Sequence, residues 1–130
     1  MASTGLPTLR CGSPLAMALY VLNMSYEQNL RKEAVEVARM LLQSDEMYLD
    51  RILRLSNIGC SLYEQCWDTE FHAFGLIASE TDHLPLQHVR QHCSQRMLTK
   101  ADIEIAEAIS HYKDMVNTAC SELIAKHEHV

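Results

Sequence analysis

The sequence contains few residues that interrupt regular structure. Its 130 residues include four glycines and three prolines, and only one tryptophan and two phenylalanines. So little glycine and proline excludes a linker-rich or low-complexity chain. No glycine stands in a phosphate-binding loop or a nucleophile elbow, which argues against nucleotide-dependent or hydrolytic chemistry. We therefore predict a protein that is not an enzyme and that carries no cofactor.

Positive charge is also scarce. Lysine and arginine number 11 against 17 aspartates and glutamates, which gives a net charge of −6 with neutral histidines. A non-specific nucleic-acid binder needs a dense positive surface that displaces counterions from phosphates. The charge balance therefore disfavours nucleic acid as a general partner but leaves a local basic patch open.

The cysteines lack the paired spacing of a metal or redox motif. Their number is odd and they are scattered along the chain, which indicates reduced thiols and a cytoplasmic protein. Residues 1–26 contain no acidic side chain, and the apolar run 14–22 is too short to cross a bilayer. The sequence leaves open whether this segment is a targeting signal. The cysteines are Cys11, Cys60, Cys66, Cys93 and Cys120.

Helical periodicity runs through most of the chain. Apolar residues recur every three or four positions, and no stretch alternates with the period of two that is typical of strands. We predict an all-α protein, namely a single-domain bundle of about five or six helices over residues 13–130, after a flexible leader at 1–12. The last helix is expected to be the longest. The predicted helices cover residues 13–23 and 25–43, which could be one continuous helix, and also 44–59, 61–78, 86–98 and 99 to the carboxyl end.

Capping signals set these boundaries. Ser25 and Thr99 are predicted to begin helices and Gly59 to end one. The aromatic residues Trp67, Phe71 and Phe74 lie at helical spacing, which predicts that they form the centre of the core.

The last predicted helix carries a regular apolar seam. Ile105, Ile109, Tyr112 and Val116 alternate spacings of four and three, as in a coiled coil. If the seam is exposed, it predicts contact with a partner or a second copy. If it is buried, it is the core-facing side of the helix.

The segment QHVRQHC at 87–93 contains two histidines four residues apart. On one helix His88 and His92 could share a metal ion, but two ligands do not make a site. Helical phasing turns them toward solvent, whereas an arc of apolar side chains is predicted to face the core. We therefore predict no metal here. The apolar arc is Leu86, Val89, Cys93 and Met97.

A basic stripe is the main candidate surface. Residues 84–101 include no acidic side chain, and basic side chains recur there at every fourth position. On a continuous helix they would form one positive face for an acidic protein segment, a phosphate group or RNA. The stripe consists of His88, His92, Arg96 and Lys100.

Together these patterns favour a small adaptor or regulatory protein. It would act through protein–protein interaction and self-associate, with the basic stripe and the seam as contact surfaces and no membrane involvement. Two alternatives stay open. One is nucleic-acid binding through the stripe, and the other is a helical bundle that binds a metal or another ligand.

Overall fold

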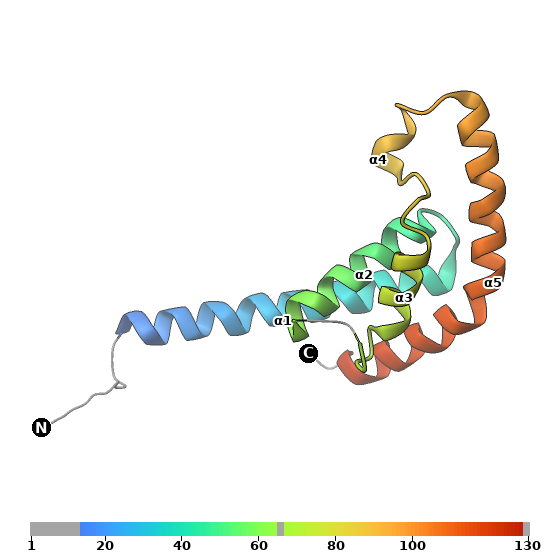
Figure 1. The fold of residues 1–130 in the computed structure, drawn as a ribbon. Coiled ribbons are helices and arrows are strands. Elements are labelled where there is room, and N and C mark those ends of the chain that lie inside the picture. The colour runs from blue at the N-terminus through green and yellow to red at the C-terminus, as the bar shows by residue number, and fades with distance from the viewer. Residues whose placement is uncertain (1–13, 65–66, 129–130) are drawn as a thin grey trace, which may run out of the picture.

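The computed structural model describes the backbone of residues 14–64 and 67–128, and the side chains of residues 24–64 and 67–128. Across these residues the chain forms five helices and no strand (Figure 1). The predictions of an all-α bundle and of a long carboxyl-terminal helix are confirmed. The leader predicted at 1–12 lies outside the described residues. The helices are α1 (Pro14–Gln43), α2 (Tyr48–Tyr63), α3 (His72–Glu80), α4 (Gln87–Arg90) and α5 (Gln95–His127).

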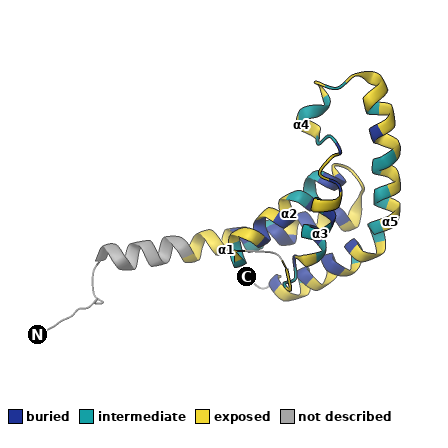
Figure 2. Cartoon of the chain, in the orientation of Figure 1, coloured by how far each residue is buried: buried dark blue, intermediate teal, exposed yellow. Residues whose placement is uncertain are grey.

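The core lies where α2 and α3 meet the carboxyl halves of α1 and α5 (Figure 2). Each of these elements contributes a side chain that is fully buried: Leu41 of α1, Ile52 of α2, Phe74 of α3 and Leu123 of α5. Burying one side chain of this size contributes about 1.5–3 kcal/mol. The first turns of α5, together with α4, lie beyond this core, and α5 changes direction along its length (Figure 1).

A single helix replaces the two predicted for residues 13–43. No proline or glycine occurs between residues 15 and 43, so nothing in the chain stops the helix. Ser25 consequently lies inside α1 and does not cap a helix. Residues 24–29 are all exposed, whereas the stripe from Leu30 to Leu41 is buried. The helix therefore projects from the core on its amino side (Figure 1).

The boundaries predicted around α2 and α3 were wrong. Gly59 is buried within α2, which continues to Tyr63 and ends at Glu64 in a left-handed conformation with φ of 69°. Trp67 then falls in the connection and is 46% exposed, so it is not part of the core. Phe71 and Phe74 are fully buried, as predicted. Because Trp67 lies in this connection and not in the predicted helix, its side chain does not share a helical face with the two phenylalanines.

The helix predicted at 86–98 is also wrong. α4 is only four residues long, and α5 begins at Gln95 with Ser94 as its cap. The Ser94 hydroxyl accepts a hydrogen bond of 3.2 Å from the Met97 amide. Thr99, the predicted cap, lies inside α5, where its hydroxyl donates to the Gln95 carbonyl at 2.9 Å. Of two available capping residues, the chain uses the earlier one.

Replacing Val116 with aspartate tests the burial of the seam. Val116 has no exposed surface, so Val116→Asp places an unpaired charge in the core. We expect a loss of about 3–5 kcal/mol in the free energy of unfolding, measured by urea denaturation. Met115 is the matched control because it is adjacent on α5 and 42% exposed. Equal losses for Val116→Asp and Met115→Asp would contradict the described packing.

Candidate functional site

The predicted basic stripe does not lie on one helix. His88 is on α4, His92 is in the turn that follows, and Arg96 and Lys100 are on α5. All four residues are exposed. The break at 91–94 ends the helical register, so the prediction of one continuous basic face is wrong. Of the predicted basic face, Arg96 and Lys100 still lie together on one helix, one turn apart at the amino end of α5.

Ion pairing separates the basic side chains of this region into two groups. Arg90 pairs with Asp102 across 2.8 Å, and His83 contacts Glu104 at 3.1 Å. Within the part of the chain that the structure describes, neither Arg96 nor Lys100 has an acidic partner. These two positive charges are therefore available to an external acidic group.

The apolar seam of α5 faces inward. Val116 is buried, while Ile105, Ile109 and Tyr112 are half-buried and pack against the core. The Tyr112 hydroxyl also donates a hydrogen bond to Glu80 at the end of α3. The seam thus corresponds to the core-facing alternative stated for it. A role of these four residues in contacting a partner stays a prediction.

A groove of about 490 Å³ lies between the segment 82–93 and the amino half of α5. Met97 lines it and is 59% exposed, while Val89 and Cys93 are half-buried there. Lys100 and Glu104 supply charge along its α5 side. The apolar side chains of the groove are Leu84, Pro85, Val89, Cys93, Met97 and Ala101.

Sequence reasoning identified these apolar residues but not the groove. Val89, Cys93 and Met97 were predicted to face the core from a single helix. Because α4 ends at Arg90, the three side chains instead line a hollow between two separate elements. The signal was a set of apolar residues inside an acid-free stretch. To predict the groove from this signal, the position of the helix break had to be known. The capping rules placed that break at Thr99, whereas α5 begins after Ser94.

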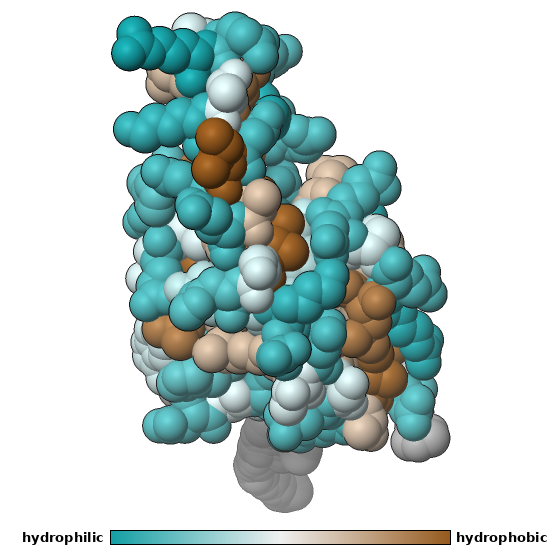
Figure 3. Space-filling view, turned by 90° about the vertical axis from the view of Figure 1, so that its right-hand side faces the viewer, coloured by the Kyte–Doolittle hydropathy of each residue, from teal (hydrophilic) through white to brown (hydrophobic). Residues whose placement is uncertain are grey.

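Elsewhere the surface beside α5 offers little continuous apolar area. Figure 3 shows small hydrophobic areas separated by hydrophilic side chains on this face. Ile103, which is 59% exposed, is one of the large hydrophobic side chains outside the groove. Scattered apolar residues of this kind are normal on soluble proteins.

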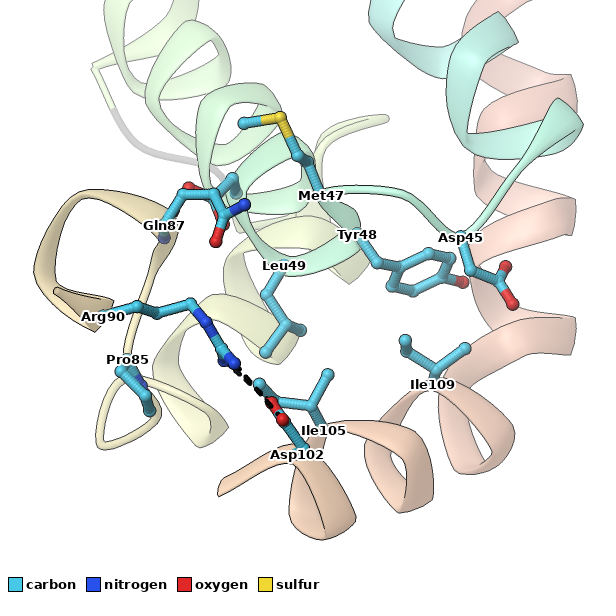
Figure 4. Close-up of a pocket in the computed structure, with 11 residues that line it drawn as sticks. Asp45, Met47, Tyr48, Leu49, Pro85, Gln87, Arg90, Asp102, Ile105 and Ile109 are labelled. Carbon is cyan, nitrogen blue, oxygen red and sulfur yellow. Dashed lines mark hydrogen bonds and ion pairs between the residues drawn. The ribbon is translucent and has the colours of Figure 1, made fainter. Parts of the chain in front are cut away.

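A second, smaller hollow of about 160 Å³ shares Pro85 with the groove. It lies between the beginning of α2, the segment 85–90 and α5 (Figure 4). The Arg90–Asp102 ion pair spans one side of it. Tyr48 and Asp45 lie at the opposite end in this view (Figure 4). The segment 82–94 therefore contributes to two separate concave surfaces.

The most strongly perturbed carboxylate lies elsewhere, in a polar cluster between the α2–α3 connection and the end of α5. The side chain of Glu70, only 8% exposed, accepts hydrogen bonds from the Tyr63 hydroxyl at 2.7 Å, from Lys126 at 3.2 Å and from His127. Burial alone raises the pKa of Glu70, but these hydrogen bonds outweigh it and lower the pKa to about 2. The cluster therefore ties the α2–α3 connection to α5.

No metal centre emerges from the described residues. Within them, no three histidine, cysteine, aspartate or glutamate side chains come together in a group that could hold a metal ion. Cys120 is buried in the core, and burial raises the pKa of its thiol to about 12. This thiol stays protonated at neutral pH and packs as a small apolar side chain.

No family model, no curated protein and no solved structure matches the chain. The geometry of the surfaces described above is therefore the basis for proposing a function. Over the described residues, none of the helices combines the length and the apolar character that crossing a membrane requires.

Replacing Glu70 with glutamine tests the polar cluster. Because the pKa of Glu70 is lowered in the folded chain, its stabilising effect is present above its ordinary value of 4.5 and is lost as pH falls toward 2. Between about pH 6 and about pH 3 we expect wild type to lose about 2 kcal/mol more unfolding free energy than Glu70→Gln. Urea denaturation at both pH values measures this difference.

The exposed residue Glu122 on α5 provides the control. Glu122→Gln should follow the pH dependence of wild type, because an exposed carboxylate contributes little to stability. If the unfolding free energy of Glu70→Gln also changed with pH as that of wild type does, the hydrogen bonds to Glu70 would not be formed as described.

Proposed function

We propose that this protein is a non-enzymatic adaptor that binds a helical segment of a partner protein in the groove between the segment 82–93 and α5. Apolar side chains of the partner would enter the groove. Acidic side chains beside them would meet Lys100 and Arg96. The single observation that carries this proposal is the apolar groove with Met97 exposed at its side.

The dimensions and lining of the groove support this proposal. A volume of about 490 Å³ accommodates several side chains, and an amphipathic helix presents such side chains at spacings of three and four. Covering Met97 and the half-buried Val89 and Cys93 removes apolar surface from water, which favours binding. Methionine suits such a surface because its flexible thioether adapts to different partners.

The two cations at the amino end of α5 support acidic side chains at that end of the partner segment. Lys100 lines the groove, and Arg96 lies one turn before it on the same helix. Both lack an acidic partner in the described structure. Asp82, and Glu104 in contact with His83, also line the groove, so its positive charge is confined to the amino end of α5. Unpaired cations beside an apolar groove favour a ligand that combines apolar and carboxylate side chains.

The alternatives receive less support. Nucleic-acid binding requires several phosphate contacts, but only two unpaired cations remain from the stripe on an acidic protein. Self-association through the seam is less favoured because Val116 and its neighbours pack inward.

A selection from a phage-displayed library of helical peptides tests the groove. We expect enriched peptides to combine apolar residues at spacings of three and four with aspartate or glutamate on an adjacent face. Met97→Glu should weaken their binding at least about tenfold, because it places a carboxylate among the apolar contacts. Fluorescence anisotropy on the enriched peptides measures the affinity.

Ile103→Glu is the matched control, since Ile103 and Met97 are equally exposed on the same helix and only Met97 lines the groove. Binding should survive this substitution. Peptides that lose affinity equally in both variants, or that are enriched in basic residues, would refute the proposed site.

A further inference from the structure

The proposed partner groove continues along α5 into another hollow, of about 310 Å³. This adjoining hollow lies between the end of α3, the segment 81–84 and α5. The groove and the adjoining hollow have three lining residues in common, namely His83, Leu84 and Glu104. From Met97 in the groove to Tyr112 in the adjoining hollow, the combined surface follows α5 for about 22 Å. This length matches about four turns of a partner helix.

Four charged side chains lie along one face of α5 in this region. They recur at spacings of four, four and three residues, which places them on the same side of a helix. Lys100 and Glu104 line the groove, and Glu104 and Glu107 line the adjoining hollow. The charge of this face therefore changes from positive to negative along α5. In chain order, the four residues are Arg96, Lys100, Glu104 and Glu107.

Glu107 differs from the other carboxylates of the adjoining hollow because it has no partner within the described structure. Glu104 contacts His83 at 3.1 Å, and Glu80 accepts a hydrogen bond from the Tyr112 hydroxyl. Glu107 is exposed and forms no ion pair or hydrogen bond with any described residue. Along this face of α5, the unpaired charges are thus two cations at one end and one carboxylate at the other.

Apolar surface runs beside these charges through both hollows. Met97 and Ala101 of α5 line the groove, Ala108 lines the adjoining hollow, and Leu84 lines both from the opposite side. Met97, Ala101 and Ala108 are separated by four and seven residues, so they share one side of α5. Small side chains at a contact let two helices approach more closely. A partner helix that packs on this side would therefore have its flanking residues near the charged face.

We propose that Glu107 sets the register of the bound partner helix, a role that rests on the function proposed above. The partner segment carries acidic residues that face Arg96 and Lys100, and one lysine or arginine that pairs with Glu107. Lys100 and Glu107 are seven residues apart, so the basic residue of the partner lies about two helical turns from its acidic residues. The occupant is thus an amphipathic helix of about four turns with its acidic and basic residues at separate positions.

A uniformly charged segment fits this surface less well. An acidic residue opposite Glu107 brings two like charges together, and a basic residue opposite Lys100 does the same at the other end. Asp82, which lines the groove from the segment 82–93, further disfavours a segment that is acidic throughout. Exposed ion pairs add little affinity, but repulsion between like charges discriminates between partners.

Three synthetic helical peptides of about 16 residues test the order of charges. All three carry the same leucines at spacings of three and four and the same glutamates at one end. About two turns from these glutamates, the first peptide has lysine, the second has glutamine and the third has glutamate. Fluorescence anisotropy with the full chain measures the affinities. We expect the first peptide to bind about fivefold more tightly than the third, with the second between them.

Glu107→Lys should reverse this order of affinities. It should weaken binding of the first peptide about fivefold and strengthen binding of the third by a similar factor, because the sign of the pairing changes. Glu122→Lys is the matched control, since Glu122 is exposed on the same helix and lines neither the groove nor the adjoining hollow. The control should keep the wild-type order. An unchanged order in Glu107→Lys would overturn the role of Glu107.

Met97→Glu separates this inference from the function on which it rests. If Met97→Glu weakens binding of the first peptide while Glu107→Lys behaves as Glu122→Lys does, the groove is occupied but Glu107 does not set the register. In that case the inference fails and the proposed function stands. If Met97→Glu leaves the affinity unchanged, or if none of the three peptides binds the wild-type chain, both fail.

Discussion

Glu70 joins the connection between α2 and α3 to the carboxyl end of α5 through hydrogen bonds in a poorly hydrated part of the molecule. This tie, together with the burial of Val116, Cys120 and Leu123, fixes the carboxyl half of α5 in the core. The amino half of the same helix then runs from the edge of the core, where Ile105 and Ile109 pack against it, to the segment 82–94 (Figure 1). The groove and the smaller hollow are both found along that half of α5.

The sequence predicted the helical class and much of the core but not the helix boundaries. The stripe from Leu30 to Leu41 and the seam of α5 are periodic over several turns, so their inward faces followed from spacing alone. The predicted helix boundaries were wrong where two sequence signals indicated different positions for the same boundary. Gly59 and Thr99 resemble a stop and a start, yet Gly59 is buried within α2, and Thr99 lies inside α5 because Ser94 caps that helix earlier.

The candidate site could be predicted only in part for the same reason. The acid-free stretch 84–101 and its apolar residues were visible in the sequence. These residues form a groove because the helix is interrupted at 91–94. Val89 and Met97 therefore lie on two separate helices joined by a turn, and not on successive turns of one helix.

The projecting half of α1 has a consequence for how the protein can be joined to other structures. A free helix of this length is barely stable in water, because forming its first turn is unfavourable. Here the packed stretch from Leu30 onward acts as the nucleus from which the exposed turns propagate. Residues 14–29 rise about 24 Å as a continuous helix. A group attached near Pro14 is thus held at a defined distance and orientation from the core, as a flexible tether could not hold it.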